Sequence, residues 1–385
     1  MVSSMAVVET QFTEQFREIL RAENDPVLRK LREIAFAAFT ELGFPAVKSE
    51  DWKYTNVGPI AKENWKVTPF SPDFSPLGEK SGENLATFNF RRNGFTALNL
   101  AFADLKIIRI AKETSVAEPI ELSFGADEDS IIFPHILIVA EAGSKATIVE
   151  SYASPAKSFT NSAIQIVVED NANLTHYRVQ KDSPDAFHYG VSEVSLGRGS
   201  SYNATNINLG GSISRHDIDV KFTAEDGEAW VDGLYMLNGS QHSDTHSIID
   251  HQMPNCTSHQ NYKGVMNDKS RAVFNGKVFV RENAHGTDAQ QSNKNLLLSN
   301  EARVDTKPQL EIFNDDVKCA HGATVGQLEE EELFYLLTRG LPENLARNLL
   351  TYGFAEEIIS KIGIEGIRSD LDASVLNRLN VKLEV

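Results

Sequence analysis

The sequence has little cysteine: Cys256 and Cys319 are the only two among 385 residues. A disulfide framework of the kind found in small secreted domains is therefore excluded, and a reducing compartment is favoured. No apolar run approaches membrane-spanning length, and residues 1–12 lack the basic and apolar segments of a signal peptide. These absences predict a soluble cytoplasmic protein.

Basic residues are also scarce, with 37 Lys and Arg against 54 Asp and Glu, which gives a net charge of −17. This charge repels phosphate backbones and anionic lipid, so neither nucleic acid nor a membrane is expected as a partner. The composition, with 41% hydrophobic and 24% charged residues, is that of an ordinary globular protein. The length suits one large domain with appendages, or two domains.

Common motifs of nucleotide-dependent and metal-dependent enzymes are missing. The sequence contains no G-x-x-x-x-G-K-[ST] phosphate loop, no G-x-G-x-x-G after a strand, no H-E-x-x-H and no C-x-x-C pair. The chain is therefore not expected to hydrolyse ATP by itself.

Residues 1–87 are predicted to form an N-terminal helical region and linker. Asp25 is suited to cap a helix that starts at Pro26, and Gly43 is suited to end it. A shorter helix is expected over residues 12–21, and the prolines between residues 59 and 82 indicate a loop-rich passage. Apolar residues recur at helical spacing between Asp25 and Gly43, namely Val27, Leu28, Leu31, Ile34, Ala35, Ala38, Phe39 and Leu42.

Residues 88–326 are predicted to form a mainly β core without helices. The alternation of Ile218, Val220 and Phe222 with Asp217 and its polar neighbours indicates a strand with one buried face. Turn clusters followed by β-type residues end at positions 146, 174, 202 and 230, which are 28 apart, and later at 272 and 302. A fixed period of this length favours a β-helix with stacked turns over a β-sandwich with coincidentally even turns.

Residues 327–385 are predicted to form a C-terminal helical domain. One helix is expected from Glu329 to Gly340, a second from Pro342 to Gly353, and two short ones over residues 356–362 and 370–379. A unit of this size would need a partner, or its own β-core, to bury its leucines.

A histidine-rich stretch contains His242, His246, His251 and His259. In an extended strand His242, Asp244 and His246 project from one face, and such ligands suit iron or zinc, so a mononuclear metal enzyme is one interpretation. The other is a polar outer face of the β-helix, with the histidines hydrogen-bonded to neighbouring turns. The second is favoured, because the spacing has none of the specificity of paired cysteines.

A second constellation is Cys319-Ala-His321-Gly322. In a strand the thiol and the imidazole lie on the same side, where they could share one transition metal, but two ligands make an incomplete site. The alternative is a buried cysteine beside a hydrogen-bonded histidine.

Several blocks of sequence are distinctive: DWKYT at 51–55, FNGKVFV at 274–280, TDAQQ at 287–291, NLLLS at 295–299, PQLEI at 308–312, DDVKCAHGATVG at 315–326 and FYL at 334–336. Together they resemble the SufB/SufD family of iron–sulfur cluster assembly proteins, and CAHGAT at 319–324 resembles the SufD version. The resemblance implies a right-handed parallel β-helix flanked by helical parts. By the same resemblance His321 matches a SufD histidine that faces SufB at the subunit interface, and Cys319 matches its neighbour.

The function implied by this resemblance is that of a non-catalytic scaffold or accessory subunit. It would pair with a SufB-like subunit, engage a SufC-like ABC ATPase and assist iron acquisition. No cofactor is expected to stay bound to the chain alone, although iron or an iron–sulfur cluster would pass transiently through the interface with SufB. In isolation a homodimer is an alternative to the heterodimer. A polysaccharide-active β-helix protein is a further alternative, against which the absence of an export signal counts.

Overall fold

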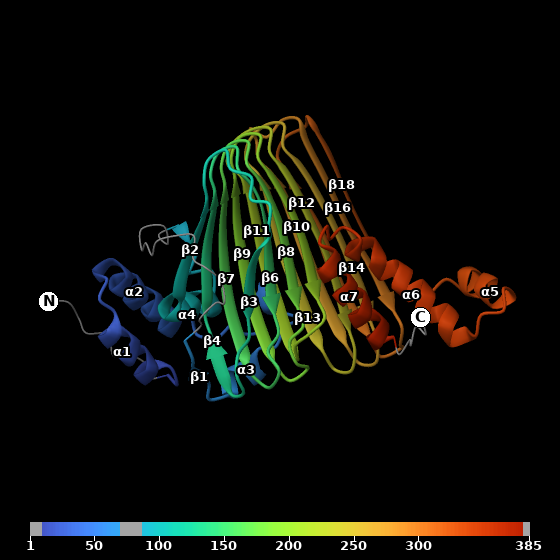
Figure 1. Cartoon of the computed structure of the whole chain (residues 1–385), viewed down its shortest axis with the longest axis horizontal. Helices are drawn as coiled ribbons and strands as arrows, with labels where there is room; N and C mark the ends of the chain where they lie inside the picture. The colour runs from blue at the N-terminus through green and yellow to red at the C-terminus, as the bar shows by residue number, and fades with distance from the viewer. Residues whose placement is uncertain (1–9, 70–86, 380–385) are drawn as a thin grey trace.

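Stacked parallel coils make up the centre of the molecule in the computed structural model, which describes residues 10–69 and 87–379 (Figure 1). Successive strands alternate between two sheets, and within each sheet neighbouring strands pair in parallel. The chain therefore winds as a β-helix, as the turn period predicted.

The two sheets form the long faces of the coil and are named here sheet A and sheet B. Sheet A contains β1 (Lys66–Val67), β2 (Asp104–Ile110), β4 (Ser130–Ile132), β5 (Pro134–Ala140), β7 (Phe159–Val168), β9 (Phe187–Leu196), β11 (Ile213–Phe222), β13 (His242–His251), β15 (Arg271–Val280) and β17 (Arg303–Ile312). Sheet B contains β3 (Ile120–Phe124), β6 (Lys145–Tyr152), β8 (Asn173–Gln180), β10 (Ser201–Asn208), β12 (Glu228–Leu237), β14 (Thr257–Met266), β16 (Thr287–Leu297) and β18 (Val317–Gly326).

The interior of the coil is held together by ladders of like side chains on neighbouring strands. Because the strands pair in register, equivalent residues of successive coils lie directly beside one another and exclude water. One such ladder of fully buried aliphatic residues crosses six strands of sheet A: Ile138, Ile166, Val194, Val220, Ile249 and Val278.

The turns from sheet A to sheet B also stack, and each of them except the last, between β17 and β18, contains one residue with φ between 56° and 70°. The backbone N–H of this residue donates to a carbonyl oxygen in the next turn, as from Asn171 to Arg198 (2.8 Å) and from Gly199 to Glu225 (3.1 Å). Glycine, asparagine and aspartate adopt this left-handed conformation most readily, which explains the composition of the turn clusters. The column consists of Glu113, Gly143, Asn171, Gly199, Asp226, Asn255 and Gly286.

The predicted 28-residue period holds for two steps and is wrong at the third. Ala146 pairs with Leu174, and Leu174 pairs with Tyr202. Tyr202 then pairs with Ala229 instead of Trp230, because this coil is one residue shorter. Trp230 consequently lies on the other face of the strand, where it is 38% exposed.

The turn clusters that end at positions 272 and 302 do not continue this series. Ala272 lies on β15, and Ala302 directly precedes β17, so both follow turns of a second column, which lead from sheet B back into sheet A. The similar composition of the two columns hid this difference, since both use glycine or aspartate at positive φ, as at Gly239 and Asp268.

Gly233 and Gly264 in sheet B provide room for the buried rings of Tyr262 and Tyr235. A Cβ on Gly264 would lie 2.1 Å from the ring of Tyr235 and 2.5 Å from Oδ1 of Asn295. Gly264→Ala should therefore lower the free energy of unfolding by about 1–3 kcal/mol, as overpacking of a core does. Gly353→Ala is the control, because nothing lies within 4 Å of that position and it is inside a helix, where alanine adds roughly 0.5–1 kcal/mol. Urea denaturation of both variants would test this, and equal stabilities would contradict it.

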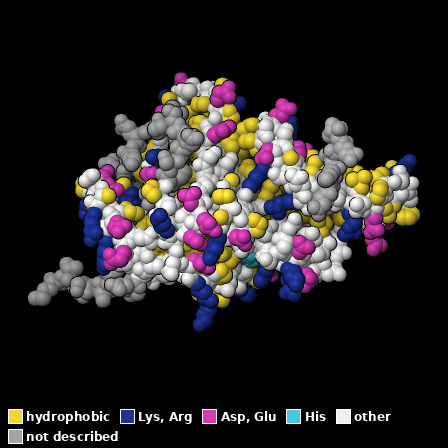
Figure 2. Space-filling model, turned by 60° about the horizontal axis from the view of Figure 1, so that its bottom comes forward, with side chains coloured by type: hydrophobic (Ala, Val, Ile, Leu, Met, Phe, Trp, Pro, Cys, Tyr) yellow, Lys and Arg dark blue, Asp and Glu magenta, His cyan; other side chains and the backbone are white. Residues whose placement is uncertain are grey.

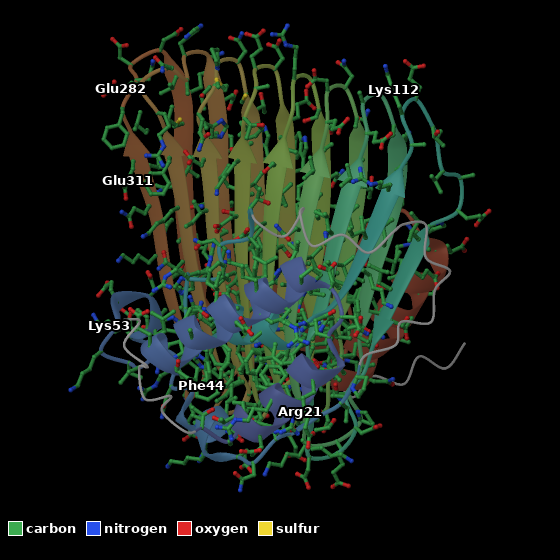
Figure 3. All side chains as sticks on the ribbon, turned by 90° about the vertical axis from the view of Figure 1, so that its left-hand side faces the viewer. Arg21, Phe44, Lys53, Lys112, Glu282 and Glu311 are labelled. Atoms are coloured by element: carbon green, nitrogen blue, oxygen red, sulfur yellow. The ribbon has the colours of Figure 1, made fainter. Side chains whose placement is uncertain are left out.

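The N-terminal helices pack at the start of the coil, at the end of the strands opposite the stacked turns marked by Lys112 and Glu282 (Figure 3). They are α1 (Thr13–Ala22), α2 (Pro26–Leu42), the short 3-10 helix η1 (Glu50–Trp52) and α3 (Gly58–Lys62). The predicted ends of α2 are confirmed: a side-chain oxygen of Asp25 accepts from the N–H groups of Val27 and Leu28, and Gly43 follows the helix at φ 62°. Of the predicted apolar stripe, however, Val27, Ile34 and Leu42 remain more than 40% exposed.

Helix α4 (Gly94–Phe102) contradicts the prediction that residues 88–326 contain no helix. Asn93 caps its start with a reciprocal hydrogen-bond pair that includes Thr96. All nine of its residues are buried, between α2 and the sheet, so no polar face marks its period in the sequence.

The C-terminal helices are α5 (Glu330–Thr338), α6 (Glu343–Ile359) and α7 (Glu365–Arg378). The predicted end at Gly353 is wrong, because α6 continues through it for six more residues. The second half of α6 and α7 pack on the outer face of sheet B, where Ile358, Ile359 and Leu371 join one apolar cluster with Val179 and Met236. Among the described residues no helix has the length and apolar character needed to cross a bilayer.

Candidate functional site

The last coil leaves one edge of each sheet open. Within the described residues β17 pairs only with β15, and β18 pairs only with β16, so the far edges of both strands are free. Large apolar side chains surround this end, with Phe313 55% and Val325 49% exposed. Unpaired strand edges combined with exposed apolar side chains are typical of a surface that another chain covers.

Cys319 and His321 both lie on β18, at this open end. Cys319 aligns with Ala289 and His321 with Gln291, so the two side chains project from the same side of the strand. Cys319 is half-buried and packs against the interior cluster, whereas His321 is exposed. Burial raises the pKa of the Cys319 thiol, which therefore favours the protonated form unless a cation lies nearby.

A groove of about 340 Å³ runs beside β18 and brings residues distant in sequence to His321. His259 lines it as well, with its ring stacked on Trp230 at 4.1 Å. Lys361, which follows α6, reaches the groove and contacts Asp232 at 2.7 Å. The structure thus places His259 and His321 along one groove, a relation that no sequence spacing indicated. In register His259 aligns with Gln290 and Ala320, so its side chain projects from the opposite face of sheet B to that of His321.

The donors on the described part of the chain do not complete a metal site. No group of three or more His, Cys, Asp or Glu side chains there is arranged to hold a metal ion. Cys319 and His321 can supply one sulfur and one nitrogen donor, which is fewer than a metal site needs.

The histidine-rich stretch is divided among separate environments. His242, His246 and His251 lie on β13 in sheet A, whereas His259 lies on β14 in sheet B. His242 and His246 share the face that the sequence predicted, but His251 lies in the interior, stacked on Phe222 at 4.5 Å. The interpretation of all four as one polar outer face is therefore wrong for His251, because the side chains of β13 alternate between the two faces of the sheet.

Two buried histidines give the protein an acid-sensitive stability. Burial lowers the pKa of His135 and of His251 to about 4. The unfolded chain, with histidine pKa values of about 6.5, then binds more protons than the folded chain between pH 6.5 and 4. The stabilisation is complete above about pH 6.5 and is lost as the pH falls towards 4, by on the order of 3 kcal/mol per histidine. Urea unfolding at pH 7 and 4.5 should show the loss, and His251→Gln should reduce it; an unchanged pH dependence in that variant would contradict the assignment.

The DWKYT segment at 51–55 docks on the outer face of sheet A. Thr55 Oγ1 hydrogen-bonds to Asp244 Oδ2 (2.5 Å) and lies 2.9 Å from His242 Nε2, and Arg215 stacks on Trp52 at 3.7 Å. Burial alone would raise the pKa of Asp244, but the charges of Arg215 and His246 hold it well below its usual range. Asp244 is thus a buried anion that anchors the N-terminal segment. Its neighbours Thr55, His242 and Arg215 take part in the contacts that hold this segment on sheet A.

Covering of sheet A also changes the environment of two aspartates. Asp217 and Asp219 were expected on a solvent-facing side of β11, but they are only 2% and 7% exposed. Both lie near Arg92, which follows the N-terminal segment and reaches over the sheet. The sequence pattern showed the alternation correctly but could not show that a distant segment covers the second face.

The fold and the site together define a parallel β-helix protein with an open terminal coil that carries a thiol and an imidazole. Comparison with known proteins agrees: residues 123–354 match the SufBD core domain of SUF system FeS cluster assembly, and residues 7–75 match the SufBD protein N-terminal region. The chain belongs to the SufB/SufD family of iron–sulfur cluster assembly proteins.

Individual relatives support this assignment. An iron–sulfur cluster assembly SufBD family protein of Synechocystis is 37% identical over 77% of this chain and 66% of its own length. SufD of Escherichia coli is 35% identical over 66% of this chain and 60% of its own length, and SufD of Bacillus subtilis is 30% identical over 74% and 66%. The match thus spans slightly less than two thirds of these relatives.

Proposed function

We propose that this protein is a non-catalytic, cytoplasmic subunit of an iron–sulfur cluster assembly complex, in which it pairs with a SufB-like subunit. The observation that carries the proposal is the open terminal coil, where free strand edges lie beside Cys319 and His321. A partner strand could extend β18, which contains no proline, whereas Pro308 removes one N–H donor from β17.

The incomplete donor set at this end supports a shared site for iron or a nascent cluster. A thiol with a raised pKa binds metal only once it loses its proton, and a metal ion or cationic group from the partner would favour that loss. Iron or a cluster is then cargo at the interface, held jointly by both chains and released to other proteins. This arrangement also explains why the chain alone would hold no cofactor.

Recruitment of a SufC-like ATPase is assigned to α5 and the start of α6. Helix α5 has no buried residue, and Phe334 and Tyr335 are 67% and 56% exposed. Leu345 and Leu349 of α6 extend the same apolar character and are 41% and 49% exposed. Unpartnered apolar helix surfaces of this kind suit a helix-mediated interface. The rest of the tail is occupied by its packing on sheet B.

The proposal is tested by co-expression with SufB-like and SufC-like proteins from the same source, followed by mass measurement of the purified assembly. We expect one species that contains all three chains. Phe313→Arg, at the open end, should reduce capture of the SufB-like chain by roughly 100-fold, because burial of an unpaired charge at an interface costs several kcal/mol. A complex that contains two copies of this chain and no SufB-like subunit would contradict the pairing.

A further inference from the structure

A ladder of amide side chains runs through the interior of the last coils and ends beside His321. Gln260 of β14 pairs in register with Gln291 of β16, and Gln291 pairs in register with His321 of β18. Neighbouring strands lie about 4.8 Å apart, so side chains at matched positions on one face contact each other, as in the glutamine ladders of stacked parallel strands. The imidazole therefore occupies the next position of this ladder, at the open end of the coil.

The amide group of Gln291 is held in one orientation. Its Nε2 donates to Oε1 of Gln260 (2.7 Å), and Nε2 of Gln260 donates to Oγ of Ser247 (2.7 Å). Gly276 of sheet A lies against the same group, since a Cβ there would be 2.4 Å from Nε2 of Gln291. This amide group is thus a fixed part of the buried interior, whereas the His321 ring beside it is exposed and can change its rotamer rapidly.

The direction of the ladder leaves one acceptor on the side of the imidazole. Because Nε2 of Gln291 points to β14, its Oε1 lies on the other side of the amide group, towards β18. This oxygen is closed to solvent and has no hydrogen-bond partner among the described residues. A buried acceptor of this kind is completed only by an adjacent side chain, and His321 is the next side chain of the ladder.

We infer that Gln291 is a positioning residue for His321. The exposed ring turns so that one of its N–H groups donates to Oε1 of Gln291, which fixes the tautomer and leaves the other ring nitrogen with a free lone pair at the open end. Histidines that bind metals commonly donate their second ring nitrogen in this way. The inference rests on the proposed function only where it concerns iron or a cluster, because the hydrogen bond and the tautomer belong to this chain alone.

Nitrogen NMR of the full chain, without metal or partner, tests the hydrogen bond. The chain carries isotope-labelled histidine and is measured at about pH 8.5, where exposed imidazoles are neutral, and His321→Ala identifies the signals of this ring. We expect one fixed tautomer, with one protonated and one unprotonated ring nitrogen. Signals averaged between the two tautomers, as in a free imidazole, would overturn the inference before any change is made to Gln291.

Two neighbouring glutamines on β16 provide a matched pair of variants. Gln291→Met removes the acceptor, and the Gln260 oxygen that loses its donor keeps the hydroxyl group of Ser247 (3.1 Å), so the fold should persist. The averaged signals should then appear. Gln290→Met changes a side chain aligned with Ala320, on the opposite face of the strand, and should leave the tautomer fixed. A fixed tautomer in both variants would contradict the role of Gln291.

The rate of cluster formation in the reconstituted complex tests the connection to the proposed function separately. Gln291→Met should lower this rate roughly tenfold or more, which is the usual effect of removing a group that orients a metal-binding histidine, whereas Gln290→Met should not. Loss of the fixed tautomer with an unchanged rate would support the positioning by Gln291 and refute the proposed ligand role of His321.

Discussion

His321→Ala should leave the chain folded and still bound to its SufB-like partner, while cluster assembly in the reconstituted complex falls by roughly tenfold or more. The side chain is exposed on an edge strand, so its removal creates no cavity in the core. At the proposed shared site, in contrast, the change removes the imidazole donor that accompanies the Cys319 thiol. The measurement is the rate of cluster formation, together with the mass of the complex.

His285→Ala is the control for this experiment. His285 is also an exposed imidazole, but it lies in the turn before β16, and only its backbone carbonyl takes part in the stacked turns. Its replacement should leave cluster formation unchanged. Assembly at the wild-type rate by His321→Ala would remove this residue from the mechanism, and loss of the complex would show that its role is structural.

Phe334→Arg should abolish capture of the SufC-like ATPase while capture of the SufB-like subunit is retained. Hydrophobic side chains gather at the tip of the molecule that α5 occupies in Figure 1, as Figure 2 shows. Full burial of such a side chain at an interface contributes about 1.5–3 kcal/mol, and an arginine in its place adds a desolvation cost, so affinity should fall by about 100-fold or more. Pull-down with purified ATPase measures the effect.

Phe313→Arg is the reciprocal control, because it places the same charge at another exposed phenylalanine. It should weaken the SufB-like contact and leave ATPase capture intact, and the opposite pattern in either variant would refute the assignment of the two surfaces. Point variants are preferred to a chain that ends near residue 326. Removal of the whole tail would also uncover the apolar outer face of sheet B, where Val179, Met236 and Val265 pack against α6 and α7.

Local sequence patterns determined much of the architecture. The even spacing of turn clusters predicted the β-helix, because stacked coils of nearly equal length require a turn at nearly constant intervals. The caps of α2 were readable since Asp25 and Gly43 act on backbone groups only a few residues away. The motif at 315–326 showed that Cys319 and His321 share one side of a strand, which depends only on the two-residue repeat of β-structure.

Only the tertiary structure decided what covers each surface. Whether Asp217 and Asp219 face solvent depends on a segment more than a hundred residues earlier in the chain, and the presence of His259 and His321 along one groove depends on the pairing of β14, β16 and β18. The fully buried α4 left no periodic trace, because every side of it contacts other elements. These features arise from contacts between residues that are distant in the sequence. Periodicity and capping, in contrast, are set by neighbours along the chain, and only such local relations can be read directly from a sequence pattern.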